Sequence, residues 1–209
     1  MIARRLAAGE KIVGKKIGVT SKAVMNMLGV YQPDFGYLLD GMVYNEGEAI
    51  AADTLIQPKA EGEIAFLLKR DLQGPGIGVS DVLAATECVM PCFEIVDSRI
   101  RDWKIKIQDT VADNASAAAI VIGARPTSLR DVDPSLIGAV LRKNGEVLET
   151  GCSGAVLGNP VIAVAWLANK VAKFGVALEP GNVIMPGSCT RMIPIAAGDH
   201  VRADFDVLG

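Results

Sequence analysis

The stretch EGEIAFLLKR, residues 61–70, sets two acidic residues into an otherwise apolar run. Side chains two apart on a strand point to the same face, so Glu61 and Glu63 would lie side by side. The other face would be apolar and would suit a protein core: Gly62, Ile64, Phe66 and Leu68. The pattern predicts a strand with one buried face and one carboxylate face, although an ordinary solvated strand fits the glutamate pair equally well.

A third acidic residue interrupts a second apolar stretch, PCFEIVDSR, residues 91–99, at Glu94. Glutamate is rarely buried without a partner, because removing its charge from water is costly. This segment is therefore either an edge strand with one solvated face or a strand in which a cation compensates Glu94. Together with Glu61 and Glu63, Glu94 could form an all-oxygen site that suits Mg²⁺ or Mn²⁺.

A lysine in VGKKIGVTS, residues 13–21, could supply proton-transfer chemistry. Lys16 shares a strand face with Gly14 and Gly18, which would leave open space beside its amine. A lysine that is partly desolvated and lies near a metal cation can have a lowered pKa, which suits acid–base catalysis. The neighbouring Lys15 is expected on the surface.

Two further segments contain polar residues that have either a functional or a structural explanation. Asp34 lies in YQPDFGYL (31–38), where proline and glycine indicate a loop, and it could be a site residue or a turn-forming aspartate. In DTVADNAS (109–116), Asn114 and Ser116 could point at a ligand or satisfy the backbone of a turn.

Strands dominate the rest of the pattern and helices are irregularly interspersed, so the sequence predicts an α+β fold rather than regular βαβ units. The other expected strands, including a hairpin with a tight turn at Asn144-Gly145, are residues 11–19, 92–99, 115–123, 140–149, 181–187 and 199–209. The expected helices are residues 21–28, 81–90 and 160–174. Residues 30–41 are expected as a loop and 99–108 as a solvated strand.

The composition disfavours several classes of function. The chain has 209 residues, a net charge of -3 and 50% hydrophobic residues, which suits one domain with apolar surface left for subunit contacts. Its acidic balance disfavours nucleic acid, and the apolar run at 160–168 is far shorter than the roughly 20 residues of a membrane helix. The single histidine, His200, argues against zinc centres and histidine-based triads. Four cysteines without metal-like spacing indicate reduced thiols in a cytoplasmic protein.

Five motifs, in order and correctly spaced, resemble the 2-keto-4-pentenoate hydratase group of the fumarylacetoacetate hydrolase superfamily: GKKIGVTS, QPDFG, EGEIAFLL, FEIVDSRIRDW and DTVADNAS. The resemblance covers essentially the whole chain. It implies a β-rich roll of packed sheet layers with a few peripheral helices, usually assembled into oligomers. Family members normally have an earlier helical segment and a further strand, so residues 1–209 are expected as a single catalytic domain without these two parts.

The resemblance also implies roles for individual residues. It makes Glu61, Glu63 and Glu94 ligands of a divalent cation, usually Mg²⁺ or Mn²⁺. It makes Lys16 and Asp34 the acid–base pair and places Asn114 and Ser116 along the substrate pocket. Many superfamily members have a substrate-contacting threonine where this chain has Pro186, and Ser188 could replace it.

The implied activity is metal-dependent addition of water to 2-hydroxypenta-2,4-dienoate (2-oxopent-4-enoate), which gives 4-hydroxy-2-oxopentanoate during meta-cleavage degradation of aromatic compounds. One alternative is decarboxylation of 2-oxo-3-hexenedioate (4-oxalocrotonate), for which Arg99 or Arg101 could bind the second carboxylate. A C–C hydrolase of acylpyruvates is disfavoured by the scarcity of histidine. A fourth interpretation is that the chain is a non-catalytic partner in a hydratase–decarboxylase complex. The carboxylate triad with Lys16 argues against it.

Overall fold

The computed structural model describes the backbone of residues 1–209 and every side chain except that of Leu28. The strands of the large sheet are β1 (Ile12–Gly18), β2 (Asp34–Leu39), β3 (Val43–Asn45), β4 (Lys59–Leu68), β5 (Thr86–Val96), β6 (Ala117–Ile122), β9 (Val183–Met185) and β10 (Ile193–Pro194). They follow the order β2-β1-β9-β4-β5-β6-β3, and β10 pairs with β4. A smaller sheet, in the order β11-β7-β8, contains β7 (Gly138–Lys143), β8 (Glu146–Cys152) and β11 (Val201–Phe205).

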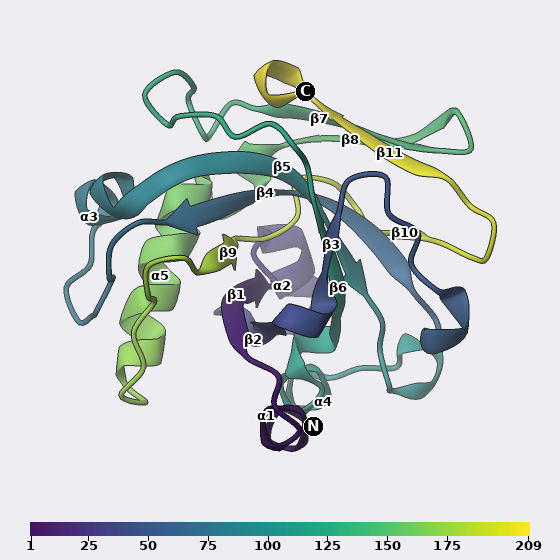
Figure 1. The fold of residues 1–209 in the computed structure, drawn as a ribbon, viewed down its shortest axis with the longest axis horizontal. Helices are drawn as coiled ribbons and strands as arrows, with labels where there is room; N and C mark the ends of the chain where they lie inside the picture. Colours follow the sequence, from purple (N-terminus) through teal and green to yellow (C-terminus); the bar gives the residue numbers. More distant parts are fainter.

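The helices are short apart from one and lie around the sheets: α1 (Ile2–Ala7), α2 (Lys22–Leu28), α3 (Val79–Ala85), α4 (Ile107–Ala112) and α5 (Pro160–Ala172). Figure 1 shows the small sheet across the top of β4 and β5, with the C-terminus beside it. The N-terminus and α1 lie at the opposite end of the molecule, near α4.

The long antiparallel pair of β4 and β5 is the centre of the fold, and its two faces differ in chemistry. On the outer face, Ala60 and Ile95 pack in one apolar cluster with Leu141 of the small sheet. Further along the same face, Phe66 is fully buried in the cluster that includes α5. The alternating side chains of both strands therefore turn to the inside of the roll, where Glu61 pairs in register with Glu94.

Helix α5 begins at Pro160 as its sequence predicts and ends at Ala172, two residues before the predicted end. The Asn159 side chain accepts a hydrogen bond from the Val161 N–H, Pro160 occupies the first turn, and Gly175 follows the helix with φ 71°. The segment Ser153–Ala172 is long and apolar enough to cross a membrane by length and composition, but half of its most apolar stretch is buried inside the protein. A buried core helix passes the same test, and α5 packs in the largest apolar cluster.

Three predicted elements are wrong. Residues 34–39, expected within a loop, form β2, which pairs with β1. The helix expected over 81–90 ends at Ala85, begins after Gly78 rather than Ser80, and is followed by β5. Residues 99–108 form a short 3-10 turn and the start of α4 rather than a strand. The second error arises because β5 is held between β4 and β6, and this tertiary pairing overrides the local helical pattern.

Candidate active site

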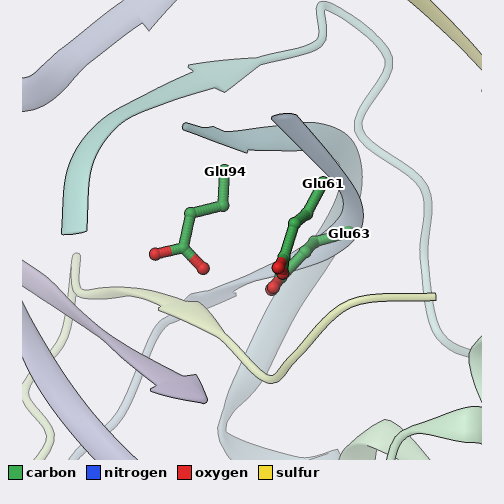
Figure 2. Close-up of side chains that lie close together, drawn as sticks. All are labelled: Glu61, Glu63 and Glu94. Atoms are coloured by element: carbon green, nitrogen blue, oxygen red, sulfur yellow. The ribbon is translucent and has the colours of Figure 1, made fainter. Parts of the chain in front are cut away.

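Three carboxylates meet inside the roll. Glu61 and Glu63 leave β4 on the same face, and Glu94 faces them from the neighbouring strand β5 (Figure 2). One oxygen from each residue lies within 4.8 Å of the other two. Glu63 and Glu94 are completely buried, whereas Glu61 is half-buried. Since β5 lies between two strands, the edge-strand explanation of Glu94 is excluded.

The buried oxygens of this triad largely lack donors. Glu63 Oε2 accepts a 3.0 Å hydrogen bond from the Gly187 N–H. Within the described part of the chain, Glu63 Oε1 and both oxygens of Glu94 have no hydrogen-bond partner. Orphaned buried acceptors are costly, and a donor set made only of carboxylates fits a hard divalent cation. The three residues therefore fit the cation site that the sequence predicts.

Electrostatics in the triad also favour added positive charge. Burial raises the pKa of Glu61 to about 7 and raises the pKa of Glu63 well above its ordinary value, and the charge of Glu94 adds to both rises. Burial likewise raises the pKa of Glu94, whereas Lys16 lowers it. Crowded carboxylates out of water resist ionisation, and a cation among them relieves that cost.

Lys16 supplies a buried cation beside the triad. Its Nζ lies 3.2 Å from Glu94 Oε1 and donates a 3.1 Å hydrogen bond to the Ala115 carbonyl. Burial lowers the pKa of Lys16, but Glu94, Asp34 and the other carboxylates raise it, and the pKa lies above its usual value. The carboxylates thus outweigh desolvation, whereas the lowered pKa expected from the sequence depends on a cation bound beside the amine.

Asp34 lies across from the end of β1, where it pairs in register with Gly18. Its Oδ2 accepts a 3.2 Å hydrogen bond from the Thr110 hydroxyl, and its Oδ1 is buried without a partner in the described residues. A Cβ at Gly18 would overlap Asp34 Oδ1 and lie 3.2 Å from Lys16 Nζ. The absence of a side chain at Gly18 thus allows the carboxylate and the amine to approach each other.

Two expectations about β1 are wrong. A Cβ at Gly14 would overlap the backbone carbonyl of Val183, so this glycine permits close strand packing with β9 and leaves no open space. Lys15 is only 3% exposed and points to the other side of β1 from Lys16. Its Nζ lies 5.8 Å from the centre of the Tyr37 ring.

Asn114 and Ser116 belong to a tight turn against β2. The three residues 114–116 have φ values of 57°, 52° and 56°, a conformation that is rare outside glycine. Asn114 Oδ1 accepts from the Tyr37 N–H at 2.8 Å, and its Nδ2 donates to the Tyr37 carbonyl at 2.9 Å. The Ser116 hydroxyl lies 3.4 Å from an Asp113 carboxylate oxygen. A substrate-lining role for both residues stays a prediction; the observed contacts of Asn114 brace β2, and that of Ser116 is with Asp113.

Some members of the site were not predicted as such. Thr110 lies in the polar stretch 109–116, which the sequence marks as unusual without indicating this residue. The Ala115 carbonyl and the Gly187 N–H are backbone groups, and a sequence pattern does not show where they point. The Ser188 hydroxyl, considered as a substrate contact, donates a 2.6 Å hydrogen bond to the Thr190 carbonyl.

Comparison with curated proteins gives close relatives, although no family model matches the chain. The chain is 66% identical over 178 residues to a 2-hydroxypent-2,4-dienoate hydratase of Pseudomonas putida, which covers 85% of this chain and 80% of that protein. It is 57% identical over 211 residues to a 2-hydroxyhexa-2,4-dienoate hydratase of Comamonas testosteroni, which covers 100% of this chain and 80% of that protein.

Solved structures confirm the α+β roll. A 4-oxalocrotonate decarboxylase from Pseudomonas putida G7, complexed with magnesium and adipate, superposes with a TM-score of 0.96 at 42% identity and covers 100% of this chain and 79% of its own. A fumarylacetoacetate hydrolase from Exiguobacterium antarcticum, 16% identical, superposes with a TM-score of 0.74, covers 96% of this chain and 73% of its own, and shares the fold alone.

Proposed function

This chain belongs to the 2-keto-4-pentenoate hydratase family, and we propose that it adds water to 2-hydroxypenta-2,4-dienoate to give 4-hydroxy-2-oxopentanoate. The observation that carries the proposal is the buried carboxylate triad beside Lys16 and Asp34, in a chain 66% identical to a named dienoate hydratase. The reaction needs proton transfers next to a developing enolate, and these side chains provide an acceptor, a donor and a place for a cation.

Glu61, Glu63 and Glu94 would hold a divalent cation, Mg²⁺ or Mn²⁺. When bound, such a cation supplies Lewis-acid stabilisation of the negative charge on the oxygens of an oxo acid. Glu63 Oε1 and Glu94 Oε2 support this assignment, because neither oxygen has a hydrogen-bond or ion-pair partner among the described residues. The similar 4-oxalocrotonate decarboxylase is known in complex with magnesium and with calcium, which supports a hard divalent cation here.

Lys16 and Asp34 would move the protons. Conversion of the dienol to the conjugated enone takes a proton from the C2 hydroxyl and places one on C5. Water then adds its oxygen to C4 and a proton goes to C3. Asp34 Oδ1, which has no partner among the described residues, would accept a proton from the hydroxyl or from water, and the Lys16 ammonium would donate one.

Assembly and location belong to the same proposal. Large exposed apolar side chains support homo-oligomer formation, and they include Met27, Tyr31, Leu136 and Phe174. A decarboxylase subunit is a second candidate partner, supported by the similarity to the decarboxylase structure. The free thiols of Cys88, Cys92, Cys152 and Cys189 support a reducing compartment, which for this catabolic activity is the cytoplasm.

Decarboxylation of 2-oxo-3-hexenedioate is the alternative activity, favoured by the TM-score of 0.96 with the decarboxylase. A diacid needs a cation for its second carboxylate. Arg99 is already committed, because its Nε lies 2.5 Å from Asp113 Oδ1 and its Nη1 donates to the Ala117 carbonyl at 3.3 Å. Arg101, the other candidate, is exposed and makes no ion pair among the described residues, so the preference for hydration rests on the higher identity to hydratases.

The test is absorbance decay of freshly generated 2-hydroxypenta-2,4-dienoate, with Mg²⁺ or Mn²⁺ and with EDTA, beside the same assay on the hexenedioate. Metal-dependent loss of the dienoate alone is expected. Loss of only the diacid with release of CO₂ would make the protein a decarboxylase. Turnover of neither substrate would contradict both activities.

Two variants test the metal ligands in the same experiment. Glu63→Gln should weaken Mg²⁺ binding more than about tenfold and remove turnover, since losing a group that only orients a metal ligand already costs this much. Glu146→Gln, at the exposed start of β8, is the matched control and should bind Mg²⁺ as the parent does. Equal Mg²⁺ affinities in both variants would rule out Glu63 as a ligand.

A further inference from the structure

Lys59 extends the active-site face of β4 by one further residue. It precedes Glu61 by two positions and therefore lies on the strand face that carries Glu61 and Glu63, with Cα atoms of successive members about 7 Å apart. Burial falls along this row, from complete at Glu63 to partial at Glu61 and Lys59. The row therefore leads from the interior of the roll to solvent, and Lys59 stands at its open end.

The ammonium of Lys59 lies against an aromatic ring, and the charge of Glu61 acts on it from beyond ion-pair distance. Its Nζ lies 4.2 Å from the centre of the Trp103 ring, within the range of a cation–π contact. Among the described residues, Nζ makes no ion pair within 4.0 Å and no hydrogen bond. An ammonium has three donors, so Lys59 keeps its hydrogen-bonding capacity for an incoming acceptor.

Trp103 is fixed by the segment that precedes Lys59. Its indole N–H donates a 2.9 Å hydrogen bond to the Gln57 carbonyl. The Gln57 side chain donates in turn to the Ser98 carbonyl at 2.7 Å, and Asp97 Oδ1 accepts from the Gln57 N–H at 2.7 Å. These bonds tie the loop after β5 to the start of β4, so the ring under the ammonium has a defined position.

Two other cationic side chains of this region already have partners, unlike Lys59. Lys16 is paired with Glu94 and bonded to the Ala115 carbonyl, and Arg99 is paired with Asp113. Lys59 thus combines a place on the active-site face, partial exposure and an unused set of donors. A carboxylate that enters the site would exchange water for a charge-assisted hydrogen bond at this point.

From this arrangement we infer that Lys59 is a substrate-recognition residue that binds a carboxylate of the oxo acid at the mouth of the site. The inference rests on the proposed function for the identity of the substrate. It predicts an effect on substrate affinity, with the metal site and the proton-transfer groups left intact.

The experiment compares Lys59→Gln with Lys69→Gln. Lys69 follows the other end of β4, about 30 Å away, where it is exposed and pairs with Glu87. Calorimetric titration in saturating Mg²⁺ measures binding of pyruvate, which has one carboxylate, and of adipate, which has two. Lys59→Gln should weaken binding about tenfold, whereas Lys69→Gln should leave it unchanged. KM for the dienoate should rise by the same factor while kcat stays within about twofold of the parent value.

The outcomes separate this inference from the proposed function. Weaker pyruvate binding places the carboxylate of a monoacid at Lys59, and weaker adipate binding alone places the distal carboxylate of a diacid there. Unchanged affinity for both ligands, or no binding of either to the parent protein, overturns the inference. An equal loss of Mg²⁺ affinity in Lys59→Gln also overturns it, because Lys59 would then act through the metal site.

Two further observations complete the test. Lys59→Arg keeps the positive charge and should recover most of the affinity. Because the titrations need no turnover, they remain decisive if the parent protein fails to hydrate the dienoate, which would refute the proposed function alone.

Discussion

The ammonium of Lys16 lies 3.2 Å from Oε1 of Glu94, although the two side chains are only 5% and 0% exposed. The pair joins β1 to β5, two strands that β9 and β4 separate in the sheet. Charges in such a place are tolerated only when each compensates the other. Lys16 therefore stabilises the fold by compensating the charge of Glu94, in addition to its proposed role in proton transfer.

Replacing Lys16 by Met tests both its stabilising role and its proton-transfer role. Without the charge of Lys16, Glu94 would be buried among other carboxylates with no compensating cation. The free energy of unfolding in EDTA should therefore be about 3 to 5 kcal/mol lower than for the parent. Added Mg²⁺ should restore part of the loss, because binding to the folded state stabilises it. Turnover in Mg²⁺ should fall at least about 100-fold. Urea unfolding and dienoate decay measure the two effects.

The control for Lys16→Met is Lys69→Met, at an exposed position on the rim of the fold. It should change neither quantity. Full turnover by Lys16→Met with Mg²⁺ bound would show that the lysine takes no part in the proton transfers, whatever its effect on stability.

Gly18→Ala is the sharpest change available at the acid–base pair. Its new methyl group would overlap Asp34 Oδ1, so the carboxylate has to move away from Lys16. Turnover should fall at least about tenfold with Mg²⁺ affinity nearly unchanged. Gly138→Ala is the control, since nothing lies within 4 Å of its Cβ position on β7. Equal activity of both variants would mean that the position of Asp34 is unimportant.

Asn114→Ala distinguishes bracing of β2 from contact with substrate. The change removes two hydrogen bonds to Tyr37 and puts alanine at a φ of 57°. If Asn114 braces β2, the substitution should lower the free energy of unfolding by about 2 kcal/mol. It should also lower kcat, because Asp34 lies on the same strand. If Asn114 instead contacts the substrate, the substitution should raise KM with stability nearly intact. Urea unfolding and steady-state kinetics separate the two results.

Asn144→Ala is a matched control for Asn114→Ala. Asn144 also has a left-handed φ, 53°, and its amide also makes two hydrogen bonds, to Asp199 and to the His200 N–H. It lies at the tip of the β7–β8 hairpin. The control should lose comparable stability and keep its kinetic constants, so that any kinetic loss in Asn114→Ala reports on its contact with β2.

Strand periodicity predicts that Glu61 and Glu63 share a face, whereas Glu94 is added because buried glutamate is rarely unpaired, and Lys16 because of the family resemblance. The strand that carries Asp34 could not be predicted. Proline and glycine around it indicate a loop, yet Gly36 is in β2 and a Cβ there would overlap the Asn114 carbonyl. This glycine marks a close approach between segments far apart in the chain, and a local pattern does not distinguish that from a turn.

The same limit explains why the partners of the site were missed. The Ala115 carbonyl reaches Lys16 because three successive residues adopt left-handed φ values. None of the three is glycine, so the residue types alone do not indicate a turn at this position. Tertiary contacts, such as the amide of Asn114 against Tyr37, hold this conformation, and they exist only in the folded chain.

Lys15 differs from its neighbour Lys16 in the sign of its pKa shift, and this gives a prediction for pH dependence. Burial lowers the pKa of Lys15 from its usual value, and Glu179 opposes the shift only in part. Its Nζ lies 3.5 Å from the Ala177 carbonyl and faces no carboxylate within ion-pair distance among the described residues. The folded state therefore binds this proton less readily than the unfolded state does.

Below the ordinary lysine pKa of 10.5, the unfolded state therefore binds more protons at this residue than the folded state does. The free energy of unfolding should accordingly rise as the pH increases toward 10.5. Lys15→Met removes the penalty and should stabilise the protein by about 1 kcal/mol at pH 7. The difference between Lys15→Met and the parent should shrink as the pH rises toward 10.5, and urea unfolding across this range measures it. Lys11→Met, at an exposed position, should show no such trend. A difference that stays constant with pH would mean that Lys15 keeps an ordinary pKa in the folded protein.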